Sequence, residues 1–481
     1  MQDATAMAEL LRAQKISFEE LLTDIETKSN QLQPKLNAWT YLDLSGAKKY
    51  YRKNQDKLSR TVFAGLPIAL KALGQSKKGW PSTSGSLLLA ENKAKVTDYF
   101  VQGIENLGFV PIGQSNVPEY GFKNITDSKL YGNCLNPFDT TRFAGGSSGG
   151  AAALVASGIL PIATASDGGG SIRIPASFCG LIGLKPTRGS MPVGPGNWRS
   201  WQGASIAFAL TKSIRDTENV FYNLRTSQPE APYQAPKREW MHYEKAVRYP
   251  LRIAYCLNNK VSDLDYRVRA ETLKIVDFLK KEGFDVEEIP YPVNMVTLMK
   301  QYYRMNAADT AAMFQEMQAK LKRPLTNQDM EEMTWVMYQF GLDLKASDYV
   351  LSLQYWDEIA AKTESLFKAY DLFLTPSTAQ AAPSVDTAFY SPNIGEKLRF
   401  SHELSPKEKE KLVYDMFAKS LSITPYTQLA NLTGQPAISL PTGRVNDDLP
   451  VGVQFMASKG REDLLLMVGA LLEQAKLFTI E

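Results

Sequence analysis

The sequence predicts an α/β fold with a layered sheet in a single large domain, and three observations support that prediction. Between Phe63 and Leu224, short apolar runs alternate with glycine-rich turns and helical stretches. From residue 251 onward the order strand, helix, strand returns. No internal repeat and no low-complexity linker divides the chain, so one domain, 1–481, is favoured over the several that length alone suggests.

The elements of the first half follow from periodicity and end signals. Residues 1–60 predict two helices, with Ser17 as an N-cap candidate and Glu20, three residues on, as its capping-box partner. Residues 63–224 predict strands in AGLPIALKAL, GFVPIGQSN and LPIATASD and a buried helix rich in small residues in GAAALVASGI. Residues 227–250 are proline-rich and charged, and they predict a surface connection.

The second half, 251–481, continues the pattern with helical insertions. LRIAYCL and DVEEIPYP predict strands on either side of a helix near 266–282, which Gly283 ends. Residues 295–370 predict helices, and the polar stretch 384–412 predicts a solvated flap or insertion. Further strands are predicted in DLFLTPSTAQAAP, GQPAISLP and LPVGVQFMAS, before a last helix with Leu464, Val468, Leu471 and Leu472 at helical spacing.

Composition and charge narrow the class of protein. The formal net charge is only +3, and no basic stripe with interleaved aromatic residues occurs, so no nucleic-acid partner is expected. No apolar run reaches transmembrane length, and no membrane partner is expected. The three cysteines lie far apart without a CxxC pair, which excludes a disulfide framework and a cysteine-rich zinc site and predicts a reducing, cytoplasmic location. A leader upstream of residue 1 stays open.

The two histidines both lie in charged segments. His242 is in REWMHYEKAVRY and His402 is in LRFSHELSPKEKEK, and both are predicted at the solvated surface. A Ser-His-Asp triad or a site with several histidine ligands therefore lacks its residues. No metal and no cofactor is expected, and a serine nucleophile in this chain needs a base other than histidine.

Two glycine-framed clusters place serines at short range. TRFAGGSSGG contains Ser147 and Ser148, and SDGGGS ends at Ser171, 24 residues after Ser147. Consecutive glycines let backbone N–H groups approach a ligand closely. A phosphate cradle needs a lysine directly after its glycines, which this stretch lacks. The favoured use is an oxyanion hole, in which successive amides face a carbonyl oxygen that becomes negative in acyl transfer.

Lys71 is the candidate base for such a serine. It follows the apolar run GLPIAL, a predicted buried strand, where a charged residue is uncommon. Burial lowers the pKa of a lysine and so allows its neutral amine to accept a proton. The alternative, a lysine at a strand end whose ammonium group reaches solvent, stays open on periodicity alone.

The segment from Gly145 to Gly189 resembles the signature segment of the amidase signature family of serine hydrolases. The likeness continues in GLPIALK, GQSNVPEYG, YGNCLNPFDTTRF and GQPAISLPTG, and it covers nearly the whole chain. It implies that family's fold, a central mixed β-sheet flanked by helices on both faces. It also implies an amidase that cleaves a carbon–nitrogen bond of a small-molecule amide through a Ser-Ser-Lys triad and an acyl-enzyme intermediate.

The resemblance assigns roles to particular residues. Ser171 matches the nucleophile, Ser147 the bridging serine, whose preceding peptide bond is cis in the family, and Lys71 the general base. In this interpretation the chain has two serines because one relays the proton of the other. The amides that match the oxyanion hole are those of Gly168, Gly169, Gly170 and Ser171.

Asp167, Arg173 and Ser148 match supporting positions. Asp167 and Arg173 are expected to brace the nucleophile turn by hydrogen bonds, and a plain structural ion pair is an equal alternative. Ser148 is expected to act as a hydrogen-bond donor behind the site. Many family members have an acidic residue directly after the lysine, whereas this chain has Ala72, which leaves the bracing of Lys71 open.

RPLTNQDMEEMTW, GQPAISLP and GREDLLL are similar to segments of bacterial amidases of the 6-aminohexanoate cyclic dimer hydrolase type. The substrate-binding residues that this likeness implies are Gly121, Phe122, Trp198 and Asn306, and the stretch 195–201 as a whole is expected near the substrate. The physiological substrate and the oligomeric state stay open, a homodimer included. Two other functions also stay open: a non-catalytic amidase-like binding or assembly protein, and the A subunit of a glutamyl-tRNA amidotransferase. Ile174, after Arg173, argues against the subunit, which typically has glutamine there.

Overall fold

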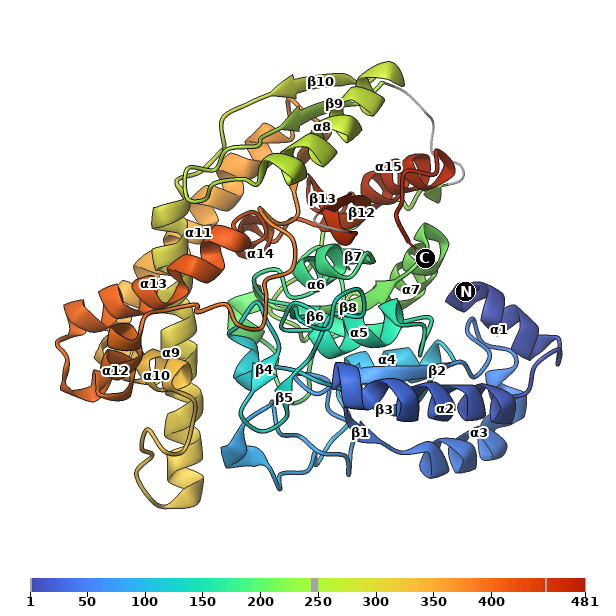
Figure 1. Cartoon of the computed structure of the whole chain (residues 1–481), viewed down its shortest axis with the longest axis horizontal. Helices are drawn as coiled ribbons and strands as arrows, with labels where there is room; N and C mark the ends of the chain where they lie inside the picture. The colour runs from blue at the N-terminus through green and yellow to red at the C-terminus, as the bar shows by residue number, and fades with distance from the viewer. Residues whose placement is uncertain (1, 244–249, 446–447, 481) are drawn as a thin grey trace.

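The computed structural model describes residues 2–243, 250–445 and 448–480, and the strands of these residues form one mixed sheet of eleven strands and a separate pair, β4 and β5 (Figure 1). The order in the large sheet is β1-β3-β2-β6-β8-β7-β12-β13-β11-β9-β10. The strands are β1 (Trp39–Leu42), β2 (Pro67–Lys71), β3 (Val110–Ser115), β4 (Asp127–Ser128), β5 (Gly132–Asn133), β6 (Ala163–Asp167), β7 (Ile182–Lys185), β8 (Ile206–Thr211), β9 (Arg252–Tyr255), β10 (Asp285–Glu288), β11 (Leu372–Pro376), β12 (Ala437–Val445) and β13 (Leu449–Ala457).

The pairing explains where the site forms. β2 lies parallel to β3 and to β6, so the C-terminal ends of β2 and β6 meet at the same edge of the sheet. From β6 to β11 the strands pair antiparallel, through β8, β7, β12 and β13, and β9 and β10 then add parallel to β11. One sheet thus joins strands from both halves of the sequence, in keeping with the layered sheet that the sequence predicts.

Helices flank the sheet. α5 packs on β2, β3, β6 and β8, and α6 packs on β7, β12 and β13. Figure 1 shows α9, α10, α12 and α13 gathered at one end, away from α1 to α3. The helices are α1 (Ala4–Arg12), α2 (Phe18–Leu36), α3 (Leu44–Leu58), α4 (Tyr99–Asn106), α5 (Gly149–Ala156), α6 (Arg173–Phe178), α7 (Ile214–Leu224), α8 (Tyr266–Lys281), α9 (Met295–Leu321), α10 (Glu332–Asp343), α11 (Ala346–Leu366), α12 (Pro392–Arg399), α13 (Pro406–Ile423), α14 (Gln428–Thr433) and α15 (Glu462–Gln474).

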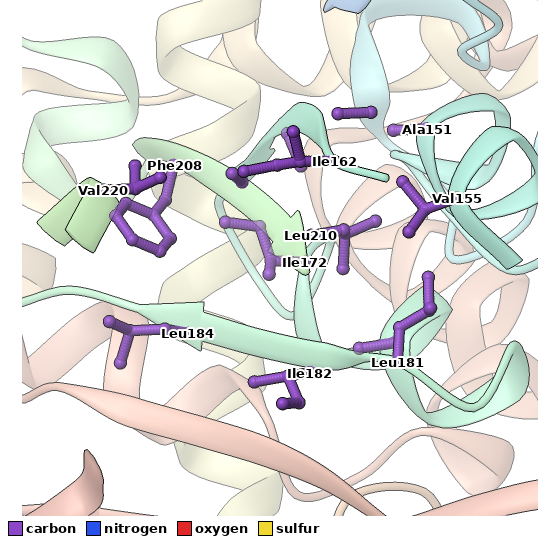
Figure 2. Close-up of a cluster of buried hydrophobic side chains, with 14 of the residues drawn as sticks. Ala151, Val155, Ile162, Ile172, Leu181, Ile182, Leu184, Phe208, Leu210 and Val220 are labelled. Carbon is purple, nitrogen blue, oxygen red and sulfur yellow. The ribbon is translucent and has the colours of Figure 1, made fainter. Parts of the chain in front are cut away.

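The core beneath the two glycine clusters consists of small and branched apolar side chains. Ile172, which directly follows Ser171, is fully buried in this core. Because its side chain is fixed there, the neighbouring serine is held at the boundary between the core and the surface of the sheet edge. Figure 2 shows Ile172 together with Ala151 and Val155 of α5, Ile182 and Leu184 of β7, and Phe208 and Leu210 of β8.

Most predicted elements are present, and the Ser17–Glu20 capping box begins α2 as predicted. One prediction was wrong. Residues 1–60 contain three helices and the short strand β1, because a four-residue strand leaves too little periodicity to detect. The polar stretch 384–412, predicted as a solvated flap or insertion, is mostly exposed or half-buried and contains α12 and the start of α13, in which few apolar side chains, such as Leu398 and Leu412, are buried. In the predicted surface connection, residues 244–249 lie outside the described residues.

Within the described residues no helix combines the length and the apolar character needed to cross a membrane.

Candidate active site

Lys71 is the last residue of β2 and is fully buried, so its ammonium group does not reach solvent. Its Nζ lies 2.9 Å from Ser147 Oγ, 2.9 Å from Ser166 Oγ and 3.3 Å from the Ser166 carbonyl oxygen. Burial lowers the pKa of Lys71 from 10.5 to about 7, and the charge of Asp167 opposes this only in part. Near neutral pH a large fraction of this amine is therefore uncharged and able to accept a proton.

Ser147 lies between Lys71 and the neighbouring cavity. It follows a cis peptide bond, Gly146–Ser147, in agreement with the resemblance, and it precedes α5. The chain can pass here only with glycine at position 146, because a Cβ there would meet the backbone of Ile125 at 2.4 Å. This close passage brings the Ser147 hydroxyl to Lys71, 76 residues away in sequence.

Ser171 ends the second glycine cluster and lines the same cavity as Ser147. Ser171 is 7% exposed, and among the described residues its hydroxyl has no hydrogen-bond partner. Gly170, directly before it, has φ +133°, a conformation that L side chains rarely adopt. The turn therefore presents the Ser171 hydroxyl to the cavity without engaging it elsewhere.

Asp167 and Arg173 form a buried ion pair behind this turn. Arg173 donates from Nε and from one terminal nitrogen to the two Asp167 oxygens, each at 2.9 Å. Asp167 also accepts the Gly170 and Ile172 amides, at 2.7 and 3.1 Å. Burial alone raises the pKa of Asp167, but the guanidinium beside it lowers it to about 2. The pair is thus both a structural ion pair and a brace of the glycine turn that ends at Ser171.

Three side chains from distant segments hold the carbonyl groups of the glycine turn. Tyr302 of α9 donates to Gly168 O at 2.9 Å, Thr427 donates to Gly169 O at 2.6 Å, and Asn431 of α14 donates to Asp167 O at 3.0 Å. Because these donors bind the carbonyl groups of the turn, the backbone amides of the turn point in other directions. The sequence analysis did not identify Tyr302, Thr427 or Asn431, since a contact across more than a hundred residues has no local signal.

The four amides predicted for the oxyanion hole are not equivalent. The Gly170 amide donates to Asp167 at 2.7 Å, so it is occupied in this structure. Among the described residues, the amides of Gly168, Gly169 and Ser171 have no protein acceptor. The geometry thus leaves three of the four amides for a ligand, because the brace of the turn uses the fourth.

Ser166 is a fourth residue that the sequence analysis missed. It precedes Asp167 in β6, and both its hydroxyl and its carbonyl face Lys71 Nζ. Ser148, predicted as a donor behind the site, donates to this same Ser166 carbonyl at 3.2 Å and accepts its amide at 3.4 Å. The signal for Ser166 was its place beside Asp167 at the end of the predicted strand LPIATASD.

A cavity of about 430 Å³ opens in front of the two serines. Of the predicted substrate-binding residues, Gly121 and Phe122 line it, whereas Trp198 and Asn306 do not. Trp198 packs instead on Tyr99, and Asn306 is buried in α9. Trp201 and other residues of the predicted stretch 195–201 do line the cavity, together with the α9 residues Asp309, Thr310, Met313 and Met317.

The histidines lie away from this cavity. The side chains of His242 and His402 are 41% and 44% exposed. Within the part of the chain that the structure describes, no group of three or more histidine, cysteine or acidic side chains is placed to hold a metal ion.

Comparisons with known proteins agree with this architecture. A sequence model of the amidase family matches residues 20–466. A lipoamidase of Enterococcus faecalis is 37% identical over 474 residues, 98% of this chain, and the chain spans 63% of that protein's length. A 6-aminohexanoate-cyclic-dimer hydrolase of Pseudomonas sp. (strain NK87) is 32% identical, with 98% of this chain and 94% of that protein covered. A solved structure of 6-aminohexanoate cyclic dimer hydrolase complexed with substrate, also 32% identical, superposes with a TM-score of 0.86 over 98% of this chain and 97% of that one. These matches confirm the predicted fold class and the predicted resemblance.

Proposed function

The chain belongs to the amidase family and is an amidase, and we propose that Ser171, Ser147 and Lys71 carry out its hydrolysis of a small-molecule amide. One observation carries the proposal: a fully buried lysine with a pKa of about 7 lies 2.9 Å from a serine that shares a cavity with a second, unengaged serine. A serine hydroxyl is a weak nucleophile until a base takes its proton, and no histidine lines the cavity among the described residues.

The contacts of Lys71 suit a proton acceptor. A neutral amine has two N–H donors and one lone pair. The carbonyl and hydroxyl oxygens of Ser166 accept the two N–H groups, which leaves the lone pair for the hydroxyl proton of Ser147. The same three neighbours accept all three protons of the charged form, so the amine takes up and releases a proton without moving.

The proposed reaction begins as a relay. Lys71 takes the proton of Ser147, Ser147 takes the proton of Ser171, and the Ser171 oxygen forms a bond to the amide carbonyl carbon. The Ser171–Ser147 hydrogen bond forms when the Ser171 hydroxyl rotates toward Ser147, as is common for catalytic contacts that tighten only with substrate bound. The negative charge moves to the carbonyl oxygen, where we place it on the amides of Gly168, Gly169 and Ser171.

The relay then runs in reverse. The proton on Lys71 returns through Ser147 to the nitrogen of the leaving amine, and the carbon–nitrogen bond breaks to leave an acyl group on Ser171. Water enters the place of the amine and loses a proton to the relay. It cleaves the ester, and the carboxylic acid and the free serine result.

We also propose an aliphatic acyl chain for the substrate. The cavity has apolar walls from Leu73, Leu89 and Phe100 and from the methionines of α9. The names of the two relatives, a lipoamidase and a 6-aminohexanoate-cyclic-dimer hydrolase, point in the same direction.

A fluorophosphonate probe tests the nucleophile. We expect it to label Ser171 in the wild type, identified by mass spectrometry of the peptide, and to leave Ser171→Ala unlabelled. The matched control is Ser148→Ala, which removes a buried hydroxyl close by but should keep the label on Ser171. A label on another serine would move the nucleophile to that residue, and no label with a correctly folded protein would contradict an activated serine at this site.

We propose a cytoplasmic location on the basis of the three cysteines, which are free and buried in the structure. A homodimer stays a proposal that light scattering on the purified protein tests directly.

A further inference from the structure

The charged groups on the cavity wall are all of one sign. Among the described residues that line the cavity, the only charged side chains are Asp98 and Asp309, and no lysine or arginine lines it. Neither carboxylate forms an ion pair with a described basic residue. A cavity with only negative charge disfavours a substrate carboxylate and favours a cation.

The two carboxylates differ in the hydrogen bonds that they accept from the protein. Asp98 stands at the N-cap position of α4 and receives the Ser76 amide at 2.7 Å. Asp309 has Gln202 Nε2 at only 3.5 Å, the limit of a hydrogen bond. Burial raises the pKa of Asp309, as expected for a carboxylate without a counter-ion. Asp309 is thus the less satisfied of the two.

Two aromatic rings line the same cavity as Asp309. Trp201, which directly precedes the Gln202 that lies beside Asp309, stacks on Phe122 with ring centroids 5.8 Å apart. A carboxylate beside aromatic faces is a favourable environment for an ammonium group, which gains from the charge and from the ring quadrupole. This combination distinguishes Asp309 from a general polar residue at a cavity rim.

The position of Asp309 along α9 sets its distance from the reaction. Tyr302, which donates to the glycine turn, precedes Asp309 by seven residues, or about 10 Å along the helix axis. Met313 and Met317 follow on the same face of α9 and line the cavity further out. A group bound at Asp309 is therefore joined to the scissile amide through a flexible chain.

We propose, on the basis of the proposed amidase function, that Asp309 determines specificity by binding a primary ammonium group of the substrate at the end of an aliphatic chain. The substrates are then amides with an ammonium group remote from the scissile bond, on the acyl part or on the amine part, and amides with a carboxylate in its place are rejected. Asp309 takes no part in the proton relay.

The experiment compares matched substrates that differ only at the chain end. For the acyl part these are the p-nitroanilides of 6-aminohexanoic acid, of heptanoic acid and of heptanedioic acid, which end in ammonium, methyl and carboxylate. For the amine part they are N-hexanoyl-1,5-diaminopentane and N-hexanoyl-hexylamine. In one of the two series we expect kcat/KM for the ammonium compound to exceed that of the methyl compound on the order of ten-fold. If this is the acyl series, the carboxylate compound should be the poorest of its three. The series in which this occurs identifies the part of the substrate that faces Asp309.

Asp309→Asn is the informative variant, because the side chain keeps its size and an oxygen that accepts from Gln202 Nε2 while the charge is lost. We expect it to remove the preference for ammonium and to leave the methyl compound near the wild-type kcat/KM. The matched control is Glu316→Gln on the same helix, whose side chain is 77% exposed and whose loss of charge should leave the preference unchanged. A preference lost in Asp98→Asn but kept in Asp309→Asn would overturn the assignment.

Two outcomes separate this inference from the proposed function. Hydrolysis of all the compounds by the wild type without any preference for ammonium would overturn the inference and leave the catalytic proposal intact. Binding to Ser171→Ala by calorimetry needs no turnover, so it tests the inference even if no compound is hydrolysed. Equal affinity for the ammonium and methyl compounds in both series would then overturn it.

Discussion

Two lysines end strands of the same sheet, and only one of them faces a hydroxyl group. Lys71 ends β2 and Lys185 ends β7, and both are fully buried with a pKa that burial lowers. Nζ of Lys185 donates to the carbonyl oxygen of the next residue, Pro186, at 2.7 Å. Nζ of Lys71 lies at 2.9 Å from two serine hydroxyls.

The difference teaches what makes a buried lysine a base. Burial produces the neutral amine at both positions, and next to Lys185 the positive charge of Arg173 lowers the pKa further. A carbonyl oxygen, however, has no proton to give, whereas the Ser147 hydroxyl has one and shares the cavity with Ser171. A lowered pKa is therefore necessary for the proposed role, and the neighbouring hydroxyl is what distinguishes Lys71.

The largest expected effect is on kcat/KM, and it tests the difference between Lys71 and Lys185 directly. Lys71→Met removes the proposed base and should lower kcat/KM for an anilide substrate by about 10²- to 10⁴-fold, the usual range for a general base. Lys185→Met removes an equally buried amine and should keep kcat/KM close to the wild type. Steady-state kinetics on both purified variants decides the matter. Equal losses would show that burial, and not the hydroxyl, accounts for the difference.

The next effect concerns Asp167, whose negative charge raises the pKa of both lysines. Asp167→Asn leaves the Arg173 guanidinium buried without its counter-ion, so the free energy of unfolding should fall by about 3–5 kcal/mol in urea titrations. The control variant Asp24→Asn removes an exposed partner of Lys28 and should change the free energy of unfolding by less than about 1 kcal/mol. Similar small changes in both variants would show that the buried pair does not brace the fold.

A smaller effect is expected on the free energy of unfolding, which Lys71→Met should raise although the same change lowers activity. The pKa of Lys71 is about 7 in the folded protein and 10.5 for a lysine in an unfolded chain, so between these values the unfolded chain binds more protons. Wild-type stability therefore rises with pH through this window, and the cost of the buried charge is fully present below pH 7. At pH 6 the free energy of unfolding of Lys71→Met should exceed that of the wild type by about 1–4 kcal/mol, and this difference should shrink toward pH 10. A constant difference across this range would contradict the lowered pKa.

The smallest expected effect is on the pH dependence of kcat/KM, and it concerns the surroundings of Lys71 alone. Activity needs the neutral amine, so log kcat/KM should rise with pH and level off above about pH 7. Ser166→Ala removes an oxygen that accepts from Nζ and so stabilises its charge, which should move this limb to lower pH by less than about one unit. Ser148→Ala, which removes a hydroxyl without contact to Nζ, should leave the limb in place. A limb that is unchanged in Ser166→Ala would exclude a role of this hydroxyl.

Sequence reasoning identified the residues that carry the proposed chemistry because their motif is continuous. Gly145 to Gly189 contains both serines in a fixed order, and Lys71 was the one lysine placed after a buried apolar strand upstream of them. The structure brings Lys71 and Ser147 together across the ends of adjacent elements. It leaves Ser171 as a neighbour in the same cavity without a direct bond.

The cavity wall was not predictable to the same degree. Trp198 and Trp201 lie in one loop, and only the local backbone decides which ring reaches the cavity. Trp201 has φ 48°, a left-handed conformation that no residue pattern signals for tryptophan. Asp309 sits two turns along a helix from Tyr302, and a single sequence does not show which face of that helix meets the sheet.

The donors that hold the glycine turn have a consequence for the order in which the enzyme becomes competent during synthesis. Ser171 leaves the ribosome well before Thr427 and Asn431, which fix the Gly169 and Asp167 carbonyls. Until those residues emerge, the turn lacks two of its three carbonyl anchors, and Arg173 lacks its acceptors in the same late segment. The turn that ends at Ser171 therefore acquires its observed geometry only once the C-terminal strands and helices have docked, and a nascent or truncated chain carries the whole motif without the arrangement that we propose for the oxyanion hole.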